Sequence, residues 1–156
     1  MIIYALWWEK LNQEGVLFFE SLQSKVKDLS LTDKIHLFPE PIRDMPALYA
    51  ISDIVISPST SPEAFGRTIV EAAGMKKIVI ATPIGGAPLS FIEDGITGFH
   101  IPLDSPYDAA KIIEKALSLT NEIRERIVNT ASKKVHDGYT LESMCSRTLE
   151  VYSSIL

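Results

Sequence analysis

The alternation of short apolar runs with stretches of helical periodicity is the feature that most constrains the fold of this chain. Five runs predict strands, at residues 1–8, 34–38, 53–58, 77–82 and 98–102. Continuous apolar runs are typical of strands that are covered on both faces, as in parallel sheets. Strands that alternate with helices through short connections predict βαβ units. We therefore expect an α/β chain with a Rossmann-like, doubly wound parallel sheet and helices on both faces.

Helical periodicity fills the intervals between these runs and the region after the last one. Between the first two strands, one face of the helix at 11–29 is expected to carry Leu11, Phe18, Leu22, Val26 and Leu29. A helix is expected at 45–51, with Asp44 as its N-cap and Pro46 in its first turn. Another is expected to start near Phe65 and Gly66 and to end with Gly74 as its C-cap. The other predicted helices span 89–95, 107–119, about 122–135 and 141–156. No linker interrupts the pattern, so residues 1–156 are expected to form one domain.

Charge and cysteine content narrow the classes of partner and compartment. The net charge of −5, with the basic residues scattered, argues against a nucleic-acid partner and favours a neutral or small-molecule one. The single cysteine, Cys145, cannot form an internal disulfide, which fits a reducing cytoplasm. The apolar N-terminal run is far shorter than the ~20 residues of a membrane span, and it lacks the basic start and cleavage site of a signal peptide.

Two loops follow neighbouring strands at the edge where parallel sheets bind ligands. The first is "SPSTSPEAFG" at 57–66, and the second is "TPIGGAP" at 82–88. The helix that starts near Gly66 presents unpaired N–H groups and a positive dipole end, which suit a phosphate. Gly66 has no Cβ, so a phosphate could approach the backbone closely. The pair Gly85 and Gly86 is expected to form a flexible segment able to wrap a phosphate or a sugar.

Two glutamates flank the start of this helix. Glu63 precedes it, and Glu71 stands within it among apolar neighbours, so Glu71 is expected to be buried. A buried carboxylate needs partners, either protein donors or the hydroxyls of a ribose. The two carboxylates would lie about 10 Å apart at ~1.5 Å of rise per helical residue plus the loop, which suits the two ends of a nucleotide sugar. The simpler alternative is a chance spacing, with one glutamate on a solvated face.

These segments together resemble a known enzyme family. "PEAFGRTIVEA", "KIVIATPIGGAP", "FIEDGITGFHIP" and "MPALYAISDIVISPS" are similar to the C-terminal domain of retaining glycosyltransferases of the group 1 (family 4) type. Those enzymes have the two-Rossmann-domain architecture called GT-B. Their hallmark is a pair of glutamates separated by seven residues, which Glu63 and Glu71 match. The resemblance covers nearly the whole chain.

The resemblance implies transfer of a hexose from a nucleotide-diphosphate sugar to a glycan or lipid-linked acceptor, in polysaccharide or lipopolysaccharide biosynthesis. It implies that Glu63 contacts the donor sugar beside the reacting carbon and is the catalytic residue of this domain. It implies that Glu71 binds the ribose hydroxyls, and that Gly85 and Gly86 lie on the sugar and phosphate side. The segment that would line the sugar and diphosphate consists of Ala64, Phe65, Gly66, Arg67 and Thr68.

The chain also departs from the family pattern. Ala64 replaces the usual glycine, Leu89 replaces a common glutamate, and the first strand runs into "LWWEK" rather than a glycine-bearing turn. Family members have an N-terminal acceptor domain and an earlier βα unit whose arginine and lysine grip the diphosphate, and this sequence contains neither. The same gene or a partner chain would supply them. Arg67 could substitute as the cation, although a surface or loop-bracing role is the simpler interpretation.

Further expectations concern cofactors, partners and competing functions. No cofactor or metal is expected, because Asp53 and Asp94 are scattered and the histidines, each expected to be structural, are far apart. An uncovered sheet edge or apolar face would favour self-association, and a lipid-linked acceptor would bring the protein to the inner face of the membrane as a peripheral contact. Two other functions stay open: a truncated, non-catalytic nucleotide-sugar-binding module, and a sugar-nucleotide epimerase of related fold, which the paired glutamates disfavour.

Overall fold

The computed structural model describes residues 3–6 and 13–155. The chain divides into two compact units, residues 1–45 and 46–156, each of which has its own parallel sheet. Trp7, Trp8 and Leu11, which the sequence assigned to the first strand and helix, lie outside the described residues.

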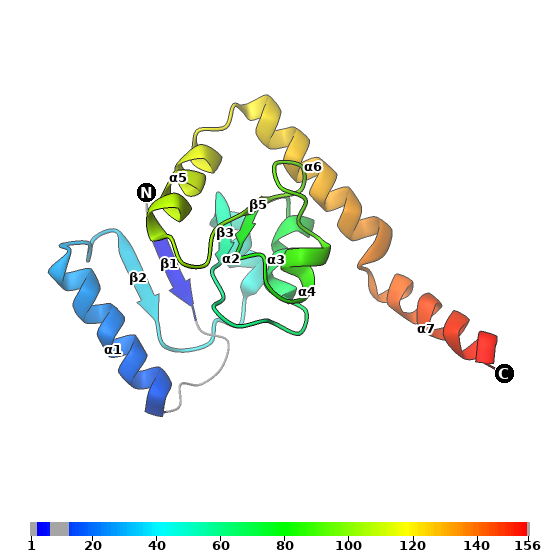
Figure 1. Ribbon diagram of the computed structural model, residues 1–156, viewed down its shortest axis with the longest axis horizontal. Helices are drawn as coiled ribbons and strands as arrows, with labels where there is room; N and C mark the ends of the chain where they lie inside the picture. The colour runs from blue at the N-terminus through cyan, green and yellow to red at the C-terminus, as the bar shows by residue number, and fades with distance from the viewer. Residues whose placement is uncertain (1–2, 7–12, 156) are drawn as a thin grey trace. The chain divides into compact units, whose positions relative to one another are not determined.

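The first unit is a βαβ unit. Strand β1 (Ile3–Leu6) pairs in parallel with β2 (Ile35–Phe38), and helix α1 (Gln13–Asp28) connects them (Figure 1). The predicted apolar face of α1 is wrong in part. Phe19 is the buried aromatic residue of this helix, while Phe18 and Leu29 are exposed. The reason is the stripe formed by positions 19, 22 and 26, whose 3- and 4-residue spacing turns position 18 toward solvent.

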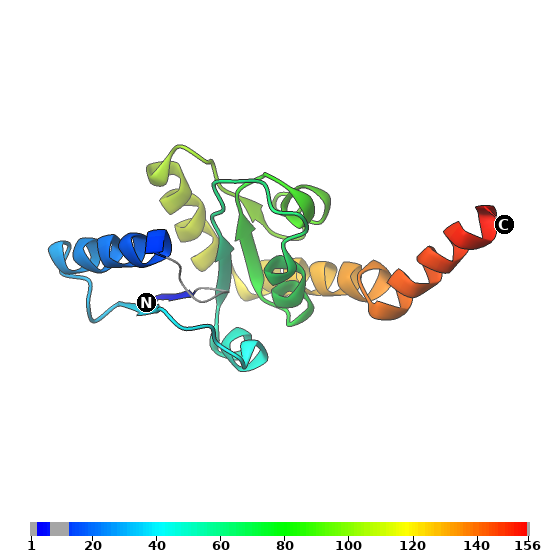
Figure 2. The same ribbon diagram turned by 90° about the horizontal axis from the view of Figure 1, so that it is seen from below.

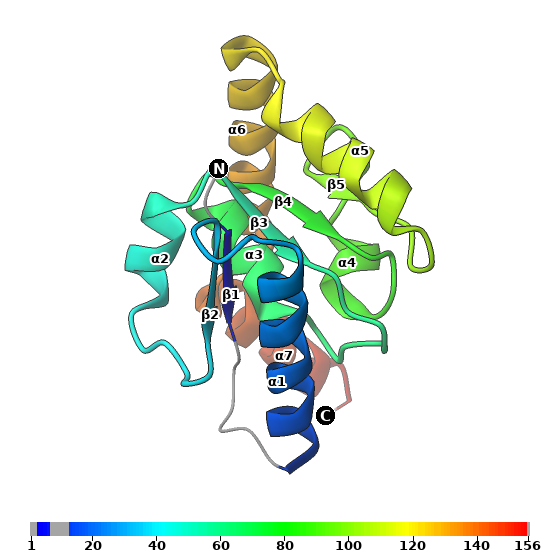
Figure 3. The ribbon, with the colours of Figure 1, turned by 90° about the vertical axis from the view of Figure 1, so that its left-hand side faces the viewer.

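The second unit is built on a three-stranded parallel sheet. Its strands are β3 (Ile54–Ser57), β4 (Ile78–Ala81) and β5 (Phe99–His100), in the order β3-β4-β5. All four residues of the central strand β4 are buried, as its unbroken apolar sequence predicts. Helices α3 (Arg67–Gly74) and α5 (Pro106–Leu117) lie on opposite sides of this sheet (Figures 2 and 3). The predicted α/β class, with a parallel sheet and helices on both faces, is confirmed.

The core of this unit lies between the sheet, α5 and the start of α6 (Asn121–Gly138). Its buried members are Ile78, Ile80, Phe99, Ile101, Ala116, Ile127 and Val128. Helices α5 and α6 each begin one residue earlier than predicted, because hydroxyl side chains cap them. The Ser105 side chain accepts a hydrogen bond from the Asp108 N–H, and that of Thr120 accepts one from the Ile123 N–H.

Helices α2 (Met45–Ile51) and α7 (Leu141–Ile155) complete the unit. Helix α2 has the predicted bounds. No side chain of α7 in the described residues is buried, and Cys145 on it is exposed. Over residues 3–6 and 13–155, no helix combines the length and the apolar character that crossing a bilayer requires.

Two helix predictions are wrong in detail. Helix α4 spans Gly86–Ser90 rather than 89–95, so it starts inside the glycine pair that looked like a loop. Helix α3 ends at Gly74 as predicted, but Gly74 is not its left-handed cap. The left-handed residue after the helix is Lys76, with a φ of 57°. The next residue, Lys77, donates its backbone N–H to the Ala72 carbonyl and so closes the helix end. Gly74 instead accepts a hydrogen bond from the Ser132 hydroxyl of α6 at 3.4 Å.

Candidate functional site

The two predicted loops lie side by side at the carboxyl ends of β3 and β4. Glu63 and Gly85 form an isolated parallel bridge, and the Gly86 N–H donates to the Glu63 carbonyl at 3.0 Å. The Ala87 N–H donates to the Phe65 carbonyl. The structure thus brings together residues 63–66 of the first loop and the glycine pair of the second, as their positions on adjacent βα units predict.

Gly85 and Gly86 make this contact sterically feasible. Gly85 has a φ of +75°, and a Cβ on it would lie 2.5 Å from the Glu63 nitrogen. A Cβ on Gly86 would lie 2.6 Å from the Ala64 carbonyl oxygen. The segment expected as a loop is instead the start of α4, which backbone hydrogen bonds hold against the neighbouring loop, and its ability to wrap a phosphate or a sugar stays a prediction. The place of the two glycines on the sugar and phosphate side of a ligand also stays a prediction.

The half-buried Glu63 carboxylate is held by hydroxyl groups at the end of β3. Its Oε1 accepts hydrogen bonds from Ser59 Oγ and, at 3.4 Å, from Ser57 Oγ. The Thr82 hydroxyl in turn donates to the Ser59 carbonyl at 2.6 Å and ties the two loops together. These three hydroxyl residues were missed by the sequence reasoning. Their signal was present, since each follows or ends an apolar strand at the edge where ligands bind.

The start of α3 is an open helix end beside this carboxylate. Gly66, with a φ of +83°, precedes the helix, and no side chain caps it. A Cβ on Gly66 would lie 2.9 Å from Glu63 Oε2, so the carboxylate lies against the glycine. The unpaired N–H groups and the positive dipole end of α3 are suited to an anion.

Glu71 is not the buried carboxylate that its neighbours suggested. Its side chain is 36 % exposed, and its Oε1 accepts hydrogen bonds from Arg67 Nε at 3.1 Å and Nη2 at 2.9 Å. The Tyr49 hydroxyl donates to Oε2 at 3.1 Å. The cause of the wrong expectation is geometric: a helix of two turns buries Ile69, Val70, Ala72 and Ala73 while positions 67 and 71 share the outer face.

Arg67 and Tyr49 differ in how firmly they are placed. The Arg67 side chain is 83 % exposed, which agrees with a surface role, and its ion pair with Glu71 spans one helical turn. Tyr49, which the sequence reasoning missed, is buried on α2. Burial raises the pKa of the Tyr49 hydroxyl above its usual range, and the charge of Glu71 raises it further. The hydroxyl is therefore a protonated donor at neutral pH.

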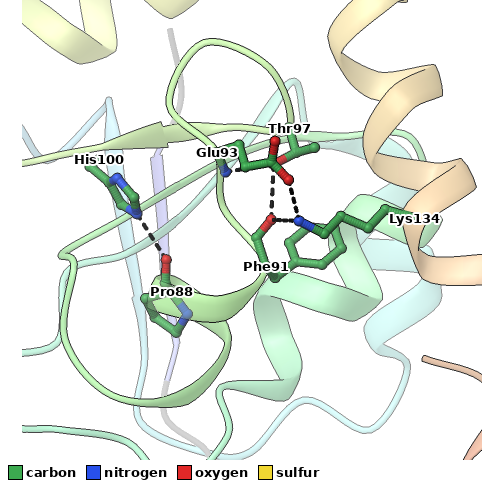
Figure 4. A network of polar contacts seen from close by, with 6 residues as sticks. All are labelled: Pro88, Phe91, Glu93, Thr97, His100 and Lys134. Carbon is green, nitrogen blue, oxygen red and sulfur yellow. Dashed lines mark hydrogen bonds and ion pairs between the residues drawn. The ribbon is translucent and has the colours of Figure 1, made fainter. Parts of the chain in front are cut away.

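A polar network secures the segment that follows α4 (Figure 4). Lys134 of α6 donates to the Phe91 carbonyl at 3.0 Å and forms an ion pair with Glu93. Thr97 donates to the same carbonyl at 3.0 Å and accepts from the Glu93 N–H at 2.8 Å. His100 Nε2 donates to the Pro88 carbonyl at 2.8 Å, a structural role for this histidine. In the described ranges, no three His, Cys, Asp or Glu side chains gather at one point.

Comparison with known proteins identifies the family. The family model of the glycosyl transferases group 1 matches residues 17–134, most of the chain. The chain belongs to the group 1 glycosyltransferases. This confirms the predicted family and its fold class, that of GT-B glycosyltransferases. Every predicted site residue of this glycosyltransferase chain, from Glu63 to Gly86, lies inside the matched range.

Individual relatives extend the comparison. A lipopolysaccharide 1,2-N-acetylglucosaminetransferase of Salmonella typhimurium is 35 % identical over 129 residues, which cover 80 % of this chain and 33 % of that protein. The crystal structure of a glycosyltransferase from Rickettsia africae superposes with a TM-score of 0.88 at 37 % identity, over 98 % of this chain and 40 % of that one. Anabaena HepE in complex with UDP gives a TM-score of 0.84 at 27 % identity, over 92 % and 38 %. The glycosyltransferase chain therefore spans about a third to two-fifths of these relatives.

Proposed function

We propose that this chain is the donor-binding domain of a retaining glycosyltransferase that moves a hexose from a nucleotide-diphosphate sugar to a glycan or lipid-linked acceptor. The observation that carries the proposal is the Glu63 carboxylate against Gly66 at the open start of α3, with the part-exposed Glu71 one turn further along the same helix. The structures of Anabaena HepE with UDP and with UDP-glucose support a nucleotide-sugar donor. The Salmonella relative supports a role in lipopolysaccharide or polysaccharide biosynthesis.

Each part of the site suits one part of the donor. Glu63 accepts hydrogen bonds from the hexose hydroxyls and lies beside the reacting carbon. The backbone from Ala64 to Thr68 lines the sugar and diphosphate, with the first N–H groups of α3 on the phosphate oxygens. Glu71 accepts hydrogen bonds from the ribose hydroxyls, and Gly85 and Gly86 lie on the sugar and phosphate side.

The chemistry required of these groups is electrostatic. Negative charge develops on the departing diphosphate, and preorganised dipoles at a helix end stabilise it. Glu63 stabilises the positive charge that develops on the sugar ring. Arg67 in the first turn of α3 is paired with Glu71, so the helix end is the main source of positive charge for the diphosphate. The domain uses no metal or cofactor. An N-terminal acceptor domain, in the same protein or a partner chain, completes the catalytic cleft. The enzyme acts in the cytoplasm and, for a lipid-linked acceptor, at the inner face of the membrane.

Calorimetric titration with UDP, GDP and ADP tests the proposal. We expect one of them to bind weakly, and Glu71→Ala to lower its affinity at least tenfold, since hydrogen bonds to a charged group contribute about 1.5–3 kcal/mol. Glu125→Ala, on the exposed surface of α6, is the matched control and keeps wild-type affinity. If no nucleotide binds at millimolar concentration, the donor-site proposal is wrong.

A second measurement separates transfer from binding alone. When an N-terminal acceptor domain is supplied, sugar transfer that Glu63→Gln abolishes supports the enzymatic role. Nucleotide-sugar binding without transfer under the same conditions would instead support the truncated, non-catalytic module.

A further inference from the structure

The Glu71 carboxylate is gripped from two sides by side chains that differ in rigidity. Arg67 holds Oε1 from the same helix, with a side chain that is 83 % exposed. Tyr49 reaches Oε2 from α2, twenty-two residues earlier in the chain, and is only 3 % exposed. The tyrosine is therefore the fixed partner, since its ring is enclosed while the arginine is surrounded by solvent.

This difference matters because a glutamate carboxylate is otherwise free to turn. The terminal torsion of a glutamate side chain is broad, so packing alone does not set the carboxylate plane. A hydrogen bond from a buried hydroxyl sets it. An ionised carboxylate has about four acceptor positions. Tyr49 takes one and the two Arg67 N–H groups take two, so one position is left for a ribose hydroxyl. The second hydroxyl of the diol takes a position that the solvent-exposed Arg67 gives up.

We propose that Tyr49 is a positioning residue of the donor site, whose hydroxyl orients Glu71 toward a vicinal diol and so sets the preference for ribonucleotides. This inference rests on the proposed function, in which Glu71 binds the ribose. Because the Tyr49 hydroxyl stays protonated at neutral pH, it always presents a donor to Glu71 and never competes with the diol as a second anion.

A purely structural role for Tyr49 makes a different prediction. If the hydroxyl only tied α2 to α3, its loss would lower the stability of the chain and weaken every nucleotide ligand to the same extent. A positioning role requires instead that the variant lose affinity mainly for ligands that carry the diol. The comparison of ligands with and without ribose hydroxyls therefore separates the two.

The test compares Tyr49→Phe with the wild-type chain. Each is titrated with the best binder among UDP, GDP and ADP, and with the 2′,3′-dideoxy form of that nucleotide. We expect Tyr49→Phe to lower the affinity for the ribose form about fivefold, and that for the dideoxy form by less than twofold, as expected for one lost hydrogen bond to a charged acceptor. Tyr152→Phe, which removes an exposed hydroxyl on α7, is the matched control and changes neither.

A measurement on the wild-type chain guards against a variant that does not fold. The NMR signal of the Tyr49 hydroxyl proton can be assigned through the protons of its own ring. We expect the chemical shift of this signal to change when the ribose form binds and to stay unchanged with the dideoxy form. An unchanged hydroxyl signal with both ligands contradicts the inference, whatever the variant does.

The outcomes also separate this inference from the proposed function. If Tyr49→Phe keeps the full preference for ribose while Glu71→Ala loses it, Tyr49 does not position Glu71, and the donor site stands. If the wild-type chain shows no preference for the ribose form, or Glu71→Ala binds as the wild type does, the ribose assignment fails and this inference fails with it.

Discussion

A Cβ atom on Gly85 would lie 2.5 Å from the backbone nitrogen of Glu63, closer than any side chain can approach. The two residues face each other in a parallel bridge that joins the loops after β3 and β4. The position of the proposed catalytic carboxylate therefore depends on a residue that has no side chain and lies on a different βα unit.

Gly85→Ala tests this dependence. We expect the free energy of unfolding, measured with urea, to fall by roughly 3 kcal/mol, because the new Cβ overlaps backbone atoms and the residue has a positive φ. Gly95→Ala is the matched control, since Gly95 has a φ of +74° but a Cβ there would meet no atom within 4 Å. Its expected loss is about 1 kcal/mol. Equal losses in the two variants would show that loop contact contributes nothing.

Glu63→Gln tests the sugar end of the site. The amide keeps an oxygen for the Ser59 and Ser57 hydroxyls but removes the charge. We expect the affinity for the nucleotide diphosphate to change less than about twofold and that for the nucleotide sugar to fall about tenfold, as charged hydrogen bonds become neutral. Glu114→Gln, on exposed α5 surface, serves as the control in the same titrations. An equal loss for both ligands would mean that Glu63 supports the whole site and not the sugar.

The raised pKa of Tyr49 predicts that the stability of the folded chain depends on pH in the alkaline range. Its pKa is raised in the folded chain, so above the unfolded value of about 10 the folded state binds more protons than the unfolded state. The stability linked to this group is complete below pH 10 and is lost as pH rises further, by at most about 1.4 kcal/mol per pH unit. Urea unfolding at pH 9 and pH 11 should show a smaller loss for Tyr49→Phe than for the wild type, with Tyr152→Phe as the control. An identical loss in Tyr49→Phe would contradict the linkage.

Substitutions at two adjacent lysines of α6 test the polar network that holds the segment after α4 (Figure 4). Lys134 is 29 % exposed and donates to the Phe91 carbonyl, whereas Lys133 is 75 % exposed and pairs with Asp137 along its own helix. We expect Lys134→Met to lower the free energy of unfolding by about 1–2 kcal/mol and Lys133→Met by less than about 0.5 kcal/mol. Thermal or urea unfolding of the two variants measures the difference, and a larger effect at Lys133 would overturn this view of the network.

The strands and most helices could be predicted because their signals are local. The apolar run of β4 and the proline that follows β3 mark those elements without any knowledge of the fold. Helix α4 could not be placed this way, because Gly86 and Pro88 are typical of loops. Its start depends on the hydrogen bond from the Gly86 N–H to the Glu63 carbonyl, which joins residues distant in sequence.

The meeting of the two loops was predictable, and the side-chain contacts around them were not. The order of strands and loops brought Glu63 and Gly85 to one edge, as the structure has them. The apolar neighbours of Glu71 pointed to burial, yet which face of a short helix meets the core depends on the elements packed against it. The contact between Tyr49 and Glu71 joins two helices, so the residue spacing within one helix cannot predict it.

Helix α3 divides its residues between two tasks. Ile69, Ala72 and Ala73 are fully buried, on a helix that packs against the sheet and α6, while Arg67 and Glu71 face outward at the proposed donor site. The inner residues can change only when the packing partners change with them, but the outer ones meet no such restriction. Specificity for a different donor could thus arise through substitutions on one side of a two-turn helix, at little cost to the integrity of the fold.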